Sequence, residues 1–289
     1  MDPSRPTLRI ALPKGRLESS VCTLLGEAGI HVLASSRAYR PELSVPGFEA
    51  KLLKPRNIVE MLQAGSRDIG FAGADWVAEL DGALVSVLDT RMDPVRIVAA
   101  APPELLVDGR LPDRPLVIAS EYGRLTERWI EASGLDARVL RSAGATEVFP
   151  PEDADVIVDN VSTGSTLRAN GLVIVDEVMT STTHLYANRA VYEDPARREA
   201  LDELVLLLSA VLESRLRVML ELNVPKEQLD AIVEALPCMR LPTVAALADD
   251  SGYGVKAAVL RKDLPRLIPA LKAQGGCDIV VTPASQIVP

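Results

Sequence analysis

Residues 154–171, ADVIVDNVSTGSTLRANG, place an aspartate and a group of hydroxyl side chains between an apolar run and a polar one. The order predicts a strand ending near Asp159, a short loop and a helix. A loop of this kind presents several backbone N–H groups, and the following helix adds its own unpaired N–H groups and positive dipole end. Gly164 lets the backbone approach a ligand closely. The hydroxyl residues are Ser162, Thr163, Ser165 and Thr166.

This pattern suits a ribose 5-phosphate. The loop would hold the phosphate, and the carboxylate of Asp159 would accept hydrogen bonds from the sugar hydroxyls. The alternative is structural: Thr163 or Thr166 caps a helix, and the glycine only makes a turn. The position of the aspartate at a strand end favours phosphate binding.

Two basic turns near the N-terminus add cations. LPKGRL places Lys14 and Arg16 on either side of a glycine, and KPR places Lys54 and Arg56 directly before a helix. Cations at a helix N-terminus oppose the helix dipole, so a bound anion would offset that cost. Two such turns in one segment favour a pyrophosphate or polyphosphate ligand, although each could be an exposed basic turn.

The motif GFAGADW predicts a strand followed by a tight turn, with Gly70 and Gly73 on either side of it and Asp75 beyond. An ordinary turn without a ligand remains the alternative.

Two more segments place polar side chains at strand ends or in loops. SEYGRLTERW places Glu121 and Tyr122 after another strand, and GATEVFP places Glu147 in a loop. Tyr122 is one of few aromatic residues, so it either packs on a base or belongs to the core.

Other common catalytic patterns are missing from the sequence. There is no Walker A motif and no GxGxxG motif. The histidines, His31 and His184, are isolated, and Cys22, Cys238 and Cys277 have neither metal-site spacing nor a disulfide framework. We therefore expect a reaction driven by positioning and charge stabilisation rather than by histidine acid–base chemistry, in a reducing, cytoplasmic compartment.

Charge and hydropathy exclude two classes of partner. The chain has 289 residues and a net charge of −9, which argues against a nucleic-acid binder that neutralises phosphates. Residues 1–60 are nevertheless net basic, which directs a small anionic ligand to that segment. The longest apolar run covers residues 204–212 and is too short to span a membrane. The N-terminal segment lacks the apolar core of a signal peptide.

The elements that position these motifs alternate between strand and helix, which predicts an α/β fold with mostly parallel strands. A capping box, with Asn57 as N-cap and Glu60 three residues later, predicts one helix start. Residues 201–223 predict a long helix running into a strand. The order β-α-β-β-α-β then follows, which is typical of a ferredoxin-like domain. We therefore expect a domain boundary near Arg215.

Taken in order along the chain, seven motifs resemble those of the long form of the ATP phosphoribosyltransferases. They are LPKGRL, KPRNI, DIGFAGADW, EYGRLTERW, GATEVFPP, ADVIVDNVSTGSTLRANGL and RKDLPRLIPALKAQGGCDIVV. The resemblance implies transfer of the 5-phosphoribosyl group of 5-phosphoribosyl 1-diphosphate (PRPP) to N1 of ATP, the first step of histidine biosynthesis. It also implies Mg²⁺ as cofactor, L-histidine as feedback inhibitor, and a homo-oligomer, a dimer or hexamer.

The resemblance further implies a two-lobed, periplasmic-binding-protein-like catalytic core with a C-terminal ferredoxin-like regulatory domain. Lobe I would comprise residues 1–95 and about 185–212, and lobe II residues 96–184 with the PRPP loop. The regulatory, histidine-binding domain would comprise residues 215–289.

The implied site residues fall on the motifs quoted above. PRPP would bind Asp159, Ser162, Thr163, Gly164, Ser165 and Thr166. The cations that act in catalysis would be Lys14, Arg16 and Arg56. ATP would bind Arg16, Gly73, Asp75, Glu121, Tyr122 and Glu147. The histidine effector would bind Asn223, Thr243 and Asp278.

Two positions depart from the expected motifs. Lys54 stands where the family often has an arginine, which keeps the charge but loses the bidentate geometry. Asn160 stands where related signatures have a second acid, so we expect Mg²⁺ to arrive on the diphosphate with few protein ligands. The rival functions are a solute-binding or regulatory subunit, a catalytically inactive paralogue, and a phosphoribosyltransferase for another base.

Overall fold

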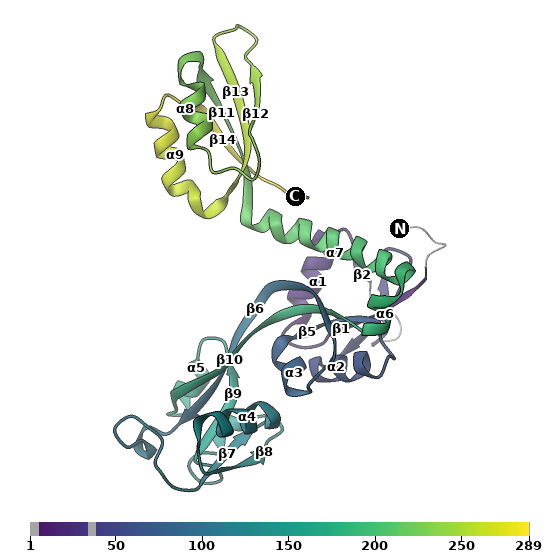
Figure 1. Cartoon of the computed structure of the whole chain (residues 1–289), viewed down its shortest axis with the longest axis vertical. Helices are drawn as coiled ribbons and strands as arrows, with labels where there is room; N and C mark the ends of the chain where they lie inside the picture. The colour runs from purple at the N-terminus through teal and green to yellow at the C-terminus, as the bar shows by residue number, and fades with distance from the viewer. Residues whose placement is uncertain (1–5, 34–38, 289) are drawn as a thin grey trace. The chain divides into compact units, whose positions relative to one another are not determined.

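The structure, a computed structural model, describes residues 6–33 and 39–288 (Figure 1). The chain divides into two compact units, one formed by Met1–Thr23 and His31–Leu201 and the other by Leu24–Ile30 and Asp202–Pro289. Residues 1–5, part of the segment that argued against a signal peptide, lie outside the described residues. Within the described ranges no helix is long and apolar enough to cross a membrane.

The first unit is built on an eight-stranded sheet. Its order is β4 (Phe48–Leu53), β1 (Leu8–Pro13), β5 (Ile69–Gly73), β10 (Val173–Ala187), β6 (Val85–Ala101), β9 (Val156–Val161), β7 (Leu116–Ser120) and β8 (Ala137–Arg141). The first strand group, β4-β1-β5, is parallel, and so is the second strand group, β9-β7-β8. The expected two-lobed α/β fold is confirmed.

The two groups are joined by a pair of long antiparallel strands, β6 and β10, which we call the crossing pair. These strands also run antiparallel to their neighbours β5 and β9, so the expectation of a mostly parallel sheet is wrong at its centre. The sequence indicated only the buried part of each strand. Residues 85–94 of β6 are mostly half-buried or exposed, with only Thr90 buried, and such a pattern resembles a loop.

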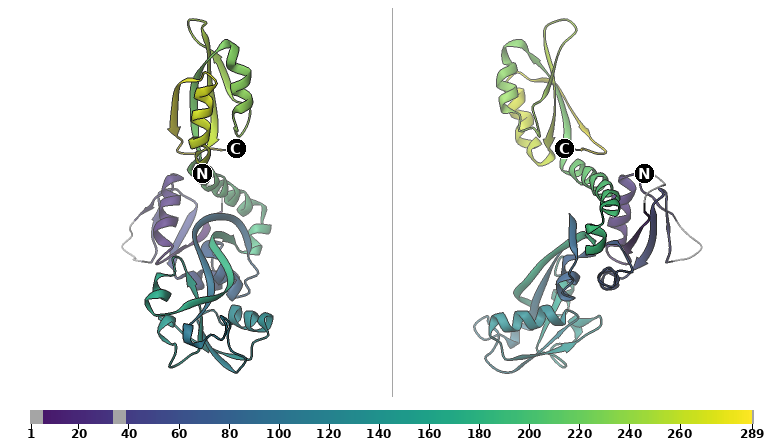
Figure 2. Two further views of the ribbon diagram at one scale, coloured as in Figure 1. Left: turned by 90° about the vertical axis from the view of Figure 1, so that its left-hand side faces the viewer. Right: turned by 45° about the vertical axis from the view of Figure 1, so that its right-hand side comes forward.

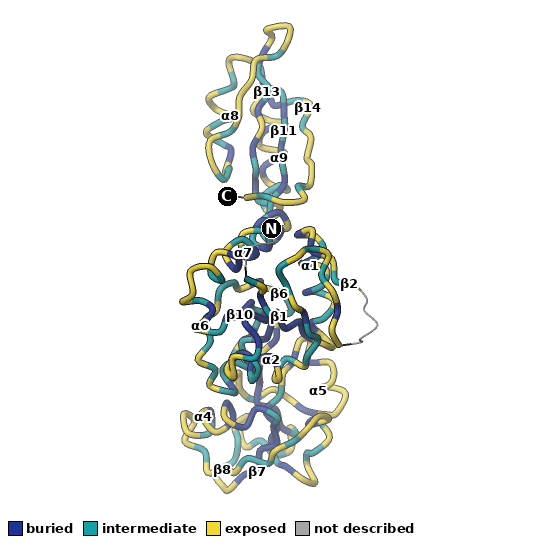
Figure 3. Tube along the Cα trace, turned by 90° about the vertical axis from the view of Figure 1, so that its right-hand side faces the viewer, coloured by how far each residue is buried: buried dark blue, intermediate teal, exposed yellow. Residues whose placement is uncertain are grey.

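Helices and short elements connect the strands. They are α1 (Glu18–Glu27), α2 (Pro55–Gln63), α3 (Ala74–Glu79), α4 (Gly123–Ser133), α5 (Ser165–Ala169), α6 (Arg189–Glu193), the 3-10 turns η1 (Pro103–Leu105) and η2 (Thr146–Val148), and the hairpin β2 (Val32–Leu33) and β3 (Glu42–Leu43). Strand β1 is buried along almost its whole length (Figure 3). Such two-sided burial is typical of parallel strands.

Helix α2 starts earlier than the capping box predicted. Lys54 occupies the N-cap position and Pro55 the first helical position, whereas Asn57 lies inside the helix and its amide donates to Glu60 Oε2 at 3.2 Å. Proline is favoured at the first helical position because its backbone angle is already helical and its missing N–H is not needed there. This preference moves the helix start ahead of Asn57.

The motif GFAGADW contains no tight turn between its glycines, so that expectation is also wrong. Gly70 and Gly73 both lie in β5, and α3 begins directly afterwards. A Cβ on Gly70 would come within 2.7 Å of Ile58 Cγ2, and one on Gly73 within 2.1 Å of Asp75 Oδ1. Both glycines therefore serve close packing rather than a turn.

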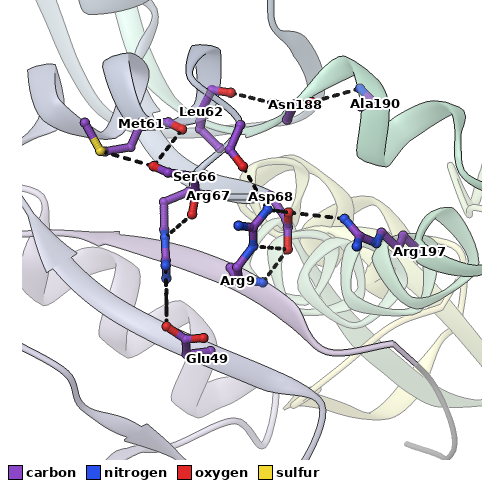
Figure 4. A network of polar contacts seen from close by, with 11 residues as sticks. Arg9, Glu49, Met61, Leu62, Ser66, Arg67, Asp68, Asn188, Ala190 and Arg197 are labelled. Atoms are coloured by element: carbon purple, nitrogen blue, oxygen red, sulfur yellow. Dashed lines mark hydrogen bonds and ion pairs between the residues drawn. The ribbon is translucent and has the colours of Figure 1, made fainter.

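A polar network surrounds Asp68, which precedes β5 at the amino end of the first strand group (Figure 4). The Asp68 carboxylate accepts from Arg9 Nη2 at 2.5 Å, Arg9 Nε at 3.1 Å and the Arg9 backbone N–H at 2.8 Å. Arg197 lies 3.5 Å away. Asn188 joins the network region through a 2.6 Å hydrogen bond to the Leu62 carbonyl. We call this set the amino-end network.

The second unit confirms the ferredoxin-like expectation. Helix α7 (Pro195–Leu216) begins before it and runs into β11 (Arg217–Pro225), as predicted for residues 201–223. The further elements are η3 (Lys226–Gln228), α8 (Leu229–Ala235), β12 (Thr243–Ala246), β13 (Gly252–Leu260), η4 (Arg261–Asp263), α9 (Leu264–Ala273) and β14 (Cys277–Pro283). The antiparallel sheet has the order β12-β13-β11-β14, and helices α8 and α9 cover one of its faces (Figure 2). That face holds the core, where alternate residues of β11 are buried.

Candidate active site

The loop between β9 and α5 forms a cavity of about 370 Å³ lined by Glu147 and by every residue from Asp159 to Leu167. The four hydroxyl residues named from the sequence are all exposed in it, and Thr163 Oγ1 lies 3.0 Å from Ser165 Oγ. Gly164 has φ of +71°, the left-handed conformation that glycine adopts without strain. Because α5 has only five residues, the donors that this loop offers are hydroxyls and backbone N–H groups rather than a helix dipole.

Asp159 lies at the rim of this cavity in acidic surroundings. Burial, followed by the negative charges of Glu121 and Glu147, raises the pKa of its carboxyl from 3.8 to about 6, against the opposing effect of the Asn160 backbone N–H. That N–H donates to Asp159 Oδ1 at 2.6 Å. Among the described residues no arginine or lysine forms an ion pair with Asp159. A ligand with hydroxyl donors would therefore meet a carboxylate that is short of partners.

A second cavity, of about 390 Å³, gathers cations from both strand groups. Its lining comprises Lys14, Lys54, Pro55, Arg56, Trp76, Glu121, Arg141, Ser142 and Ala143. The Arg56 guanidinium carbon lies 6.0 Å from the Trp76 ring centre. Four cations and an indole ring in the lining of one cavity can accept both an aromatic base and its phosphates.

A third cavity of about 470 Å³ shares Lys14 and Lys54 with the second. Its other lining residues include Tyr39, Arg40 and Lys51. Lys14 Nζ donates to the Tyr39 hydroxyl at 3.1 Å and lies 4.3 Å from the ring centre. The basic N-terminal segment thus concentrates its charge on these adjoining cavities, as the sequence indicated.

The structure separates Arg16 from the other expected cations. Its side chain is exposed and its Nη1 lies 3.5 Å from the Asp93 carbonyl oxygen on β6, and neither cationic cavity includes it. Arg56, by contrast, lines the second cavity while it pairs with Glu60 at 3.1 Å on its own helix.

Three of the expected ATP-binding residues are buried and do not line any of these three cavities. Tyr122 is 1% exposed and Asp75 is 4% exposed, and the tyrosine hydroxyl donates to Asp75 Oδ2 at 2.8 Å. Gly73 is buried in β5 next to Asp75. Glu121 and Glu147 do line cavities, the second and the first respectively.

Sequence reasoning overlooked Trp76 and Arg141. Trp76 follows Asp75 in a motif that was already quoted, and its ring centre lies 4.9 Å from that of Tyr122. Arg141 ends β8, and its guanidinium lies against the backbone of Gly123, where a Cβ would come within 2.8 Å. Both residues follow the rule that ligand contacts gather at the carboxyl ends of parallel strands, so that rule could have found them.

The expected effector residues are brought together only in part. Asn223 Nδ2 donates to Asp278 Oδ2 at 2.9 Å between adjacent strands β11 and β14. Thr243 lies on β12, at the other edge of the sheet, and pairs with Lys256. In the described ranges no three His, Cys, Asp or Glu residues are grouped as a metal site would require.

The fold and these cavities define an enzyme-like, two-lobed α/β protein whose cavities at the carboxyl ends of its strands suit phosphate-bearing small molecules. The comparisons specify which class. The family model described as ATP phosphoribosyltransferase matches residues 54–210, and the one described as HisG, C-terminal domain, matches residues 215–286.

Curated relatives named ATP phosphoribosyltransferase match nearly the whole chain. The protein from Chlorobium luteolum is 38% identical over 280 residues, 95% of each chain, and that from Pelotomaculum thermopropionicum is 35% identical over 98% of this chain and 99% of its own. The solved ATP phosphoribosyl transferase (HisG:HisZ) complex from Thermotoga maritima matches with a TM-score of 0.64 at 30% identity, over 72% of this chain and 99% of that one.

The chain therefore belongs to the ATP phosphoribosyltransferase family, in the form that carries the C-terminal domain. The activity expected from the sequence, an ATP phosphoribosyltransferase acting in the first step of histidine biosynthesis, is confirmed at this level.

Proposed function

We propose that the β9–α5 loop binds PRPP, with the ribose hydroxyls on Asp159 and the 5-phosphate on the hydroxyl-rich segment 162–166. The observation that carries this proposal is the single cavity lined by Asp159 and by the whole of that segment. An ionised carboxylate accepts hydrogen bonds only, and exposed hydroxyls and backbone N–H groups can donate to a phosphate, so the cavity offers each end of the ligand its complement.

ATP occupies the second cavity in this proposal. The adenine ring lies against Trp76, and the phosphates extend past Arg56 and Lys14 toward the cations of the third cavity. Glu121 borders the adenine side, whereas Glu147 belongs with the ribose of PRPP because it lines the first cavity. Arg141 adds a cation from the second strand group.

The reaction is a substitution at C1 of the phosphoribosyl group. The lone pair of adenine N1 forms the new bond to C1 while the bond from C1 to the diphosphate oxygen breaks, and its electron pair leaves with pyrophosphate. Negative charge grows on the leaving group, so nearby cations stabilise the transition state. Lys14, Arg16 and Arg56 are the candidates. N1 carries no proton, so the attack itself requires no general base.

Mg²⁺ fits this site as a companion of the diphosphate rather than as a resident ion. The carboxylates that line the first two cavities are Glu121, Glu147 and Asp159, and the described residues form no group that could hold a metal ion. When bound, the metal would supply charge neutralisation to the leaving diphosphate, with its remaining positions filled by water.

For regulation, the proposal is that L-histidine binds the C-terminal domain at the Asn223–Asp278 pair. The amide and the carboxylate are already held together by a 2.9 Å hydrogen bond, and they offer a donor and an acceptor to an amino acid. Thr243 belongs to this proposal only if the ligand, or a second chain, reaches the far edge strand. A homo-oligomer and a cytoplasmic location complete the expectation.

One assay tests the enzymatic part. Ultraviolet absorbance should change when ATP, PRPP and Mg²⁺ are mixed with the protein, and L-histidine should suppress the change. Folded protein that binds PRPP without turnover would support an inactive paralogue. Turnover that histidine leaves unchanged would remove the effector proposal but keep the enzyme.

A further inference from the structure

Helix α3 directs two buried carboxylates at the turn between β7 and α4. Asp75 and Glu79 are each 4% exposed and stand four residues apart, so they share one face of the helix. Glu79 accepts the backbone N–H groups of Arg124 at 3.2 Å and Leu125 at 3.0 Å, at the N-terminus of α4. Helix α3, which follows the first strand group, thus holds the turn between β7 and α4 of the second strand group in place.

Asp75 starts a longer chain of hydrogen bonds. Ser181 on β10 donates to Asp75 Oδ1 at 2.8 Å, and Tyr122 donates to Asp75 Oδ2 at 2.8 Å. The Tyr122 hydroxyl in turn lies 3.1 Å from Asn160 Nδ2, and the same nitrogen lies 3.3 Å from Asp159 Oδ1. The chain connects the crossing pair with the carboxylate at the rim of the first cavity.

The direction of this chain is fixed by the chemistry of its members. An ionised carboxylate only accepts, so Tyr122 must donate its single proton to Asp75. Burial and the charge of Asp75 raise the pKa of the Tyr122 hydroxyl far above its usual range, so it keeps that proton. The tyrosine oxygen can then only accept, and only the NH₂ end of Asn160 can meet it. The amide is thereby turned with the same NH₂ toward Asp159.

The members of this chain of hydrogen bonds differ in burial. Ser181 is 4% exposed and Tyr122 is 1% exposed, whereas Asn160 is exposed and lines the cavity. Trp76 packs beside the tyrosine ring. The buried members are therefore held by packing, and they contact the side chain of Asn160, which lies near the carboxyl end of β9 beside Asp159.

We infer that Ser181, Asp75 and Tyr122 are positioning residues for PRPP: through Asn160 they set the place and orientation of Asp159, without contact with ATP. This inference rests on the proposed function of the β9–α5 loop. It contrasts with the simple transfer of family motifs, in which Asp75 and Tyr122 touch ATP, and the two assignments differ in which substrate they affect.

The experiment is steady-state kinetics of Tyr122→Phe with each substrate varied in turn. Removal of the hydroxyl breaks the hydrogen bonds to Asp75 and Asn160, so KM for PRPP should rise about 5- to 10-fold, the range expected for one lost hydrogen bond. KM for ATP should stay within about twofold. A rise in KM for ATP alone, or equal changes in both, would overturn the inference.

Asn160→Ala interrupts the same chain of hydrogen bonds at a second point. Asn160 is exposed, so loss of its side chain does not threaten folding. Its effect on KM for PRPP should equal or exceed that of Tyr122→Phe, and the double variant should match Asn160→Ala alone, because both act through one chain. Additive effects would show separate roles. Tyr192→Phe makes the same change on α6, outside this chain of hydrogen bonds, and should leave both KM values unchanged.

Binding measurements on wild-type protein distinguish failure of the proposed function from failure of the positioning role. If calorimetry with PRPP alone shows no binding to wild-type protein and turnover is absent, the proposed function fails. If wild-type protein binds PRPP and Tyr122→Phe binds it equally well, only the positioning role fails.

Discussion

Asp68 and Asp159 both lie at strand ends of the same eight-stranded sheet, but charges of opposite sign surround them. Asp68, in the amino-end network, accepts three hydrogen bonds from Arg9 and has Arg197 nearby. Burial alone would raise its pKa, yet these partners hold the pKa below its usual range. Asp159, at the carboxyl end, has Glu121 and Glu147 as its charged neighbours, and its pKa is raised.

The difference distinguishes a site that stabilises the fold from the proposed PRPP-binding site. A buried carboxylate with well-placed arginines is satisfied before any ligand arrives, so its removal weakens the fold. A carboxylate that is desolvated among like charges is unfavourable in the free protein, and a ligand with hydroxyl donors relieves it. The amino end therefore contributes stability, whereas the proposed function of the carboxyl end explains why an unfavourable carboxylate is kept there.

Matched Asp→Asn substitutions give the sharpest test of this comparison. Asp159→Asn should lower kcat/KM for PRPP by about 100-fold, or ~2.7 kcal/mol, because the ribose hydroxyls lose a charged acceptor. The same variant should unfold at equal or higher temperature, since the unfavourable charge is gone. Steady-state kinetics and thermal denaturation measure both. A clear loss of thermal stability would place Asp159 with Asp68.

Asp68→Asn should have the opposite profile. Its side chain is 2% exposed, and loss of its charged hydrogen bonds should lower the free energy of unfolding by about 2–3 kcal/mol. KM for both substrates should stay unchanged in the folded protein. Urea denaturation provides the first value and kinetics below the transition provide the second. Unchanged stability would contradict the structural role of the amino-end network.

Two arginines extend the contrast with smaller effects. Arg16→Ala should lower kcat by about 10-fold without a change in melting temperature, because the side chain is exposed and its proposed partner is a substrate phosphate. Arg197→Ala, whose guanidinium lies 3.5 Å from Asp68, should leave kcat unchanged and lower the free energy of unfolding by about 1 kcal/mol. Normal turnover in Arg16→Ala would remove that residue from the catalytic cations.

The pH dependence of the two carboxyls should also run in opposite senses. Asp159 must be ionised to accept from ribose, so kcat/KM for PRPP should fall as pH drops below about 6, by about tenfold at pH 5. Substrate phosphates titrate in the same range. Asp159→Asn is therefore measured alongside, and any dependence that it retains belongs to the substrate.

The stability curves follow from the same shifts. The folded pKa of Asp159 is raised, so its contribution is most favourable below the ordinary pKa of 3.8 and is lost as pH rises toward 6. The folded pKa of Asp68 is lowered, so its contribution is present above 3.8 and is lost as pH falls below that value. Difference curves between wild-type protein and each Asn variant separate the two.

The sequence predicted the local features of the molecule better than the contacts between segments that are distant along the chain. The loop at residues 159–166 was found because strand, aspartate, glycine and hydroxyls are contiguous, and the ferredoxin-like tail because its periodicities are regular. The crossing pair was underestimated because half of β6 is exposed and resembles a loop. The burial of Tyr122 depends on Asp75, 47 residues earlier, and no local pattern specifies that contact.

The crossing pair has a mechanical consequence. Where two lobes are joined by loops, they turn freely about a hinge, but here they are joined by two hydrogen-bonded strands, and any change of angle must bend that ribbon elastically. Its pairing is irregular at several points between Ile174 and Tyr186, and Arg91 and Asp93, opposite the part that follows Ser181, have positive φ, so we expect the ribbon to bend in this zone. Ser181 lies in this zone, so we expect bending there to shift the serine that donates to Asp75.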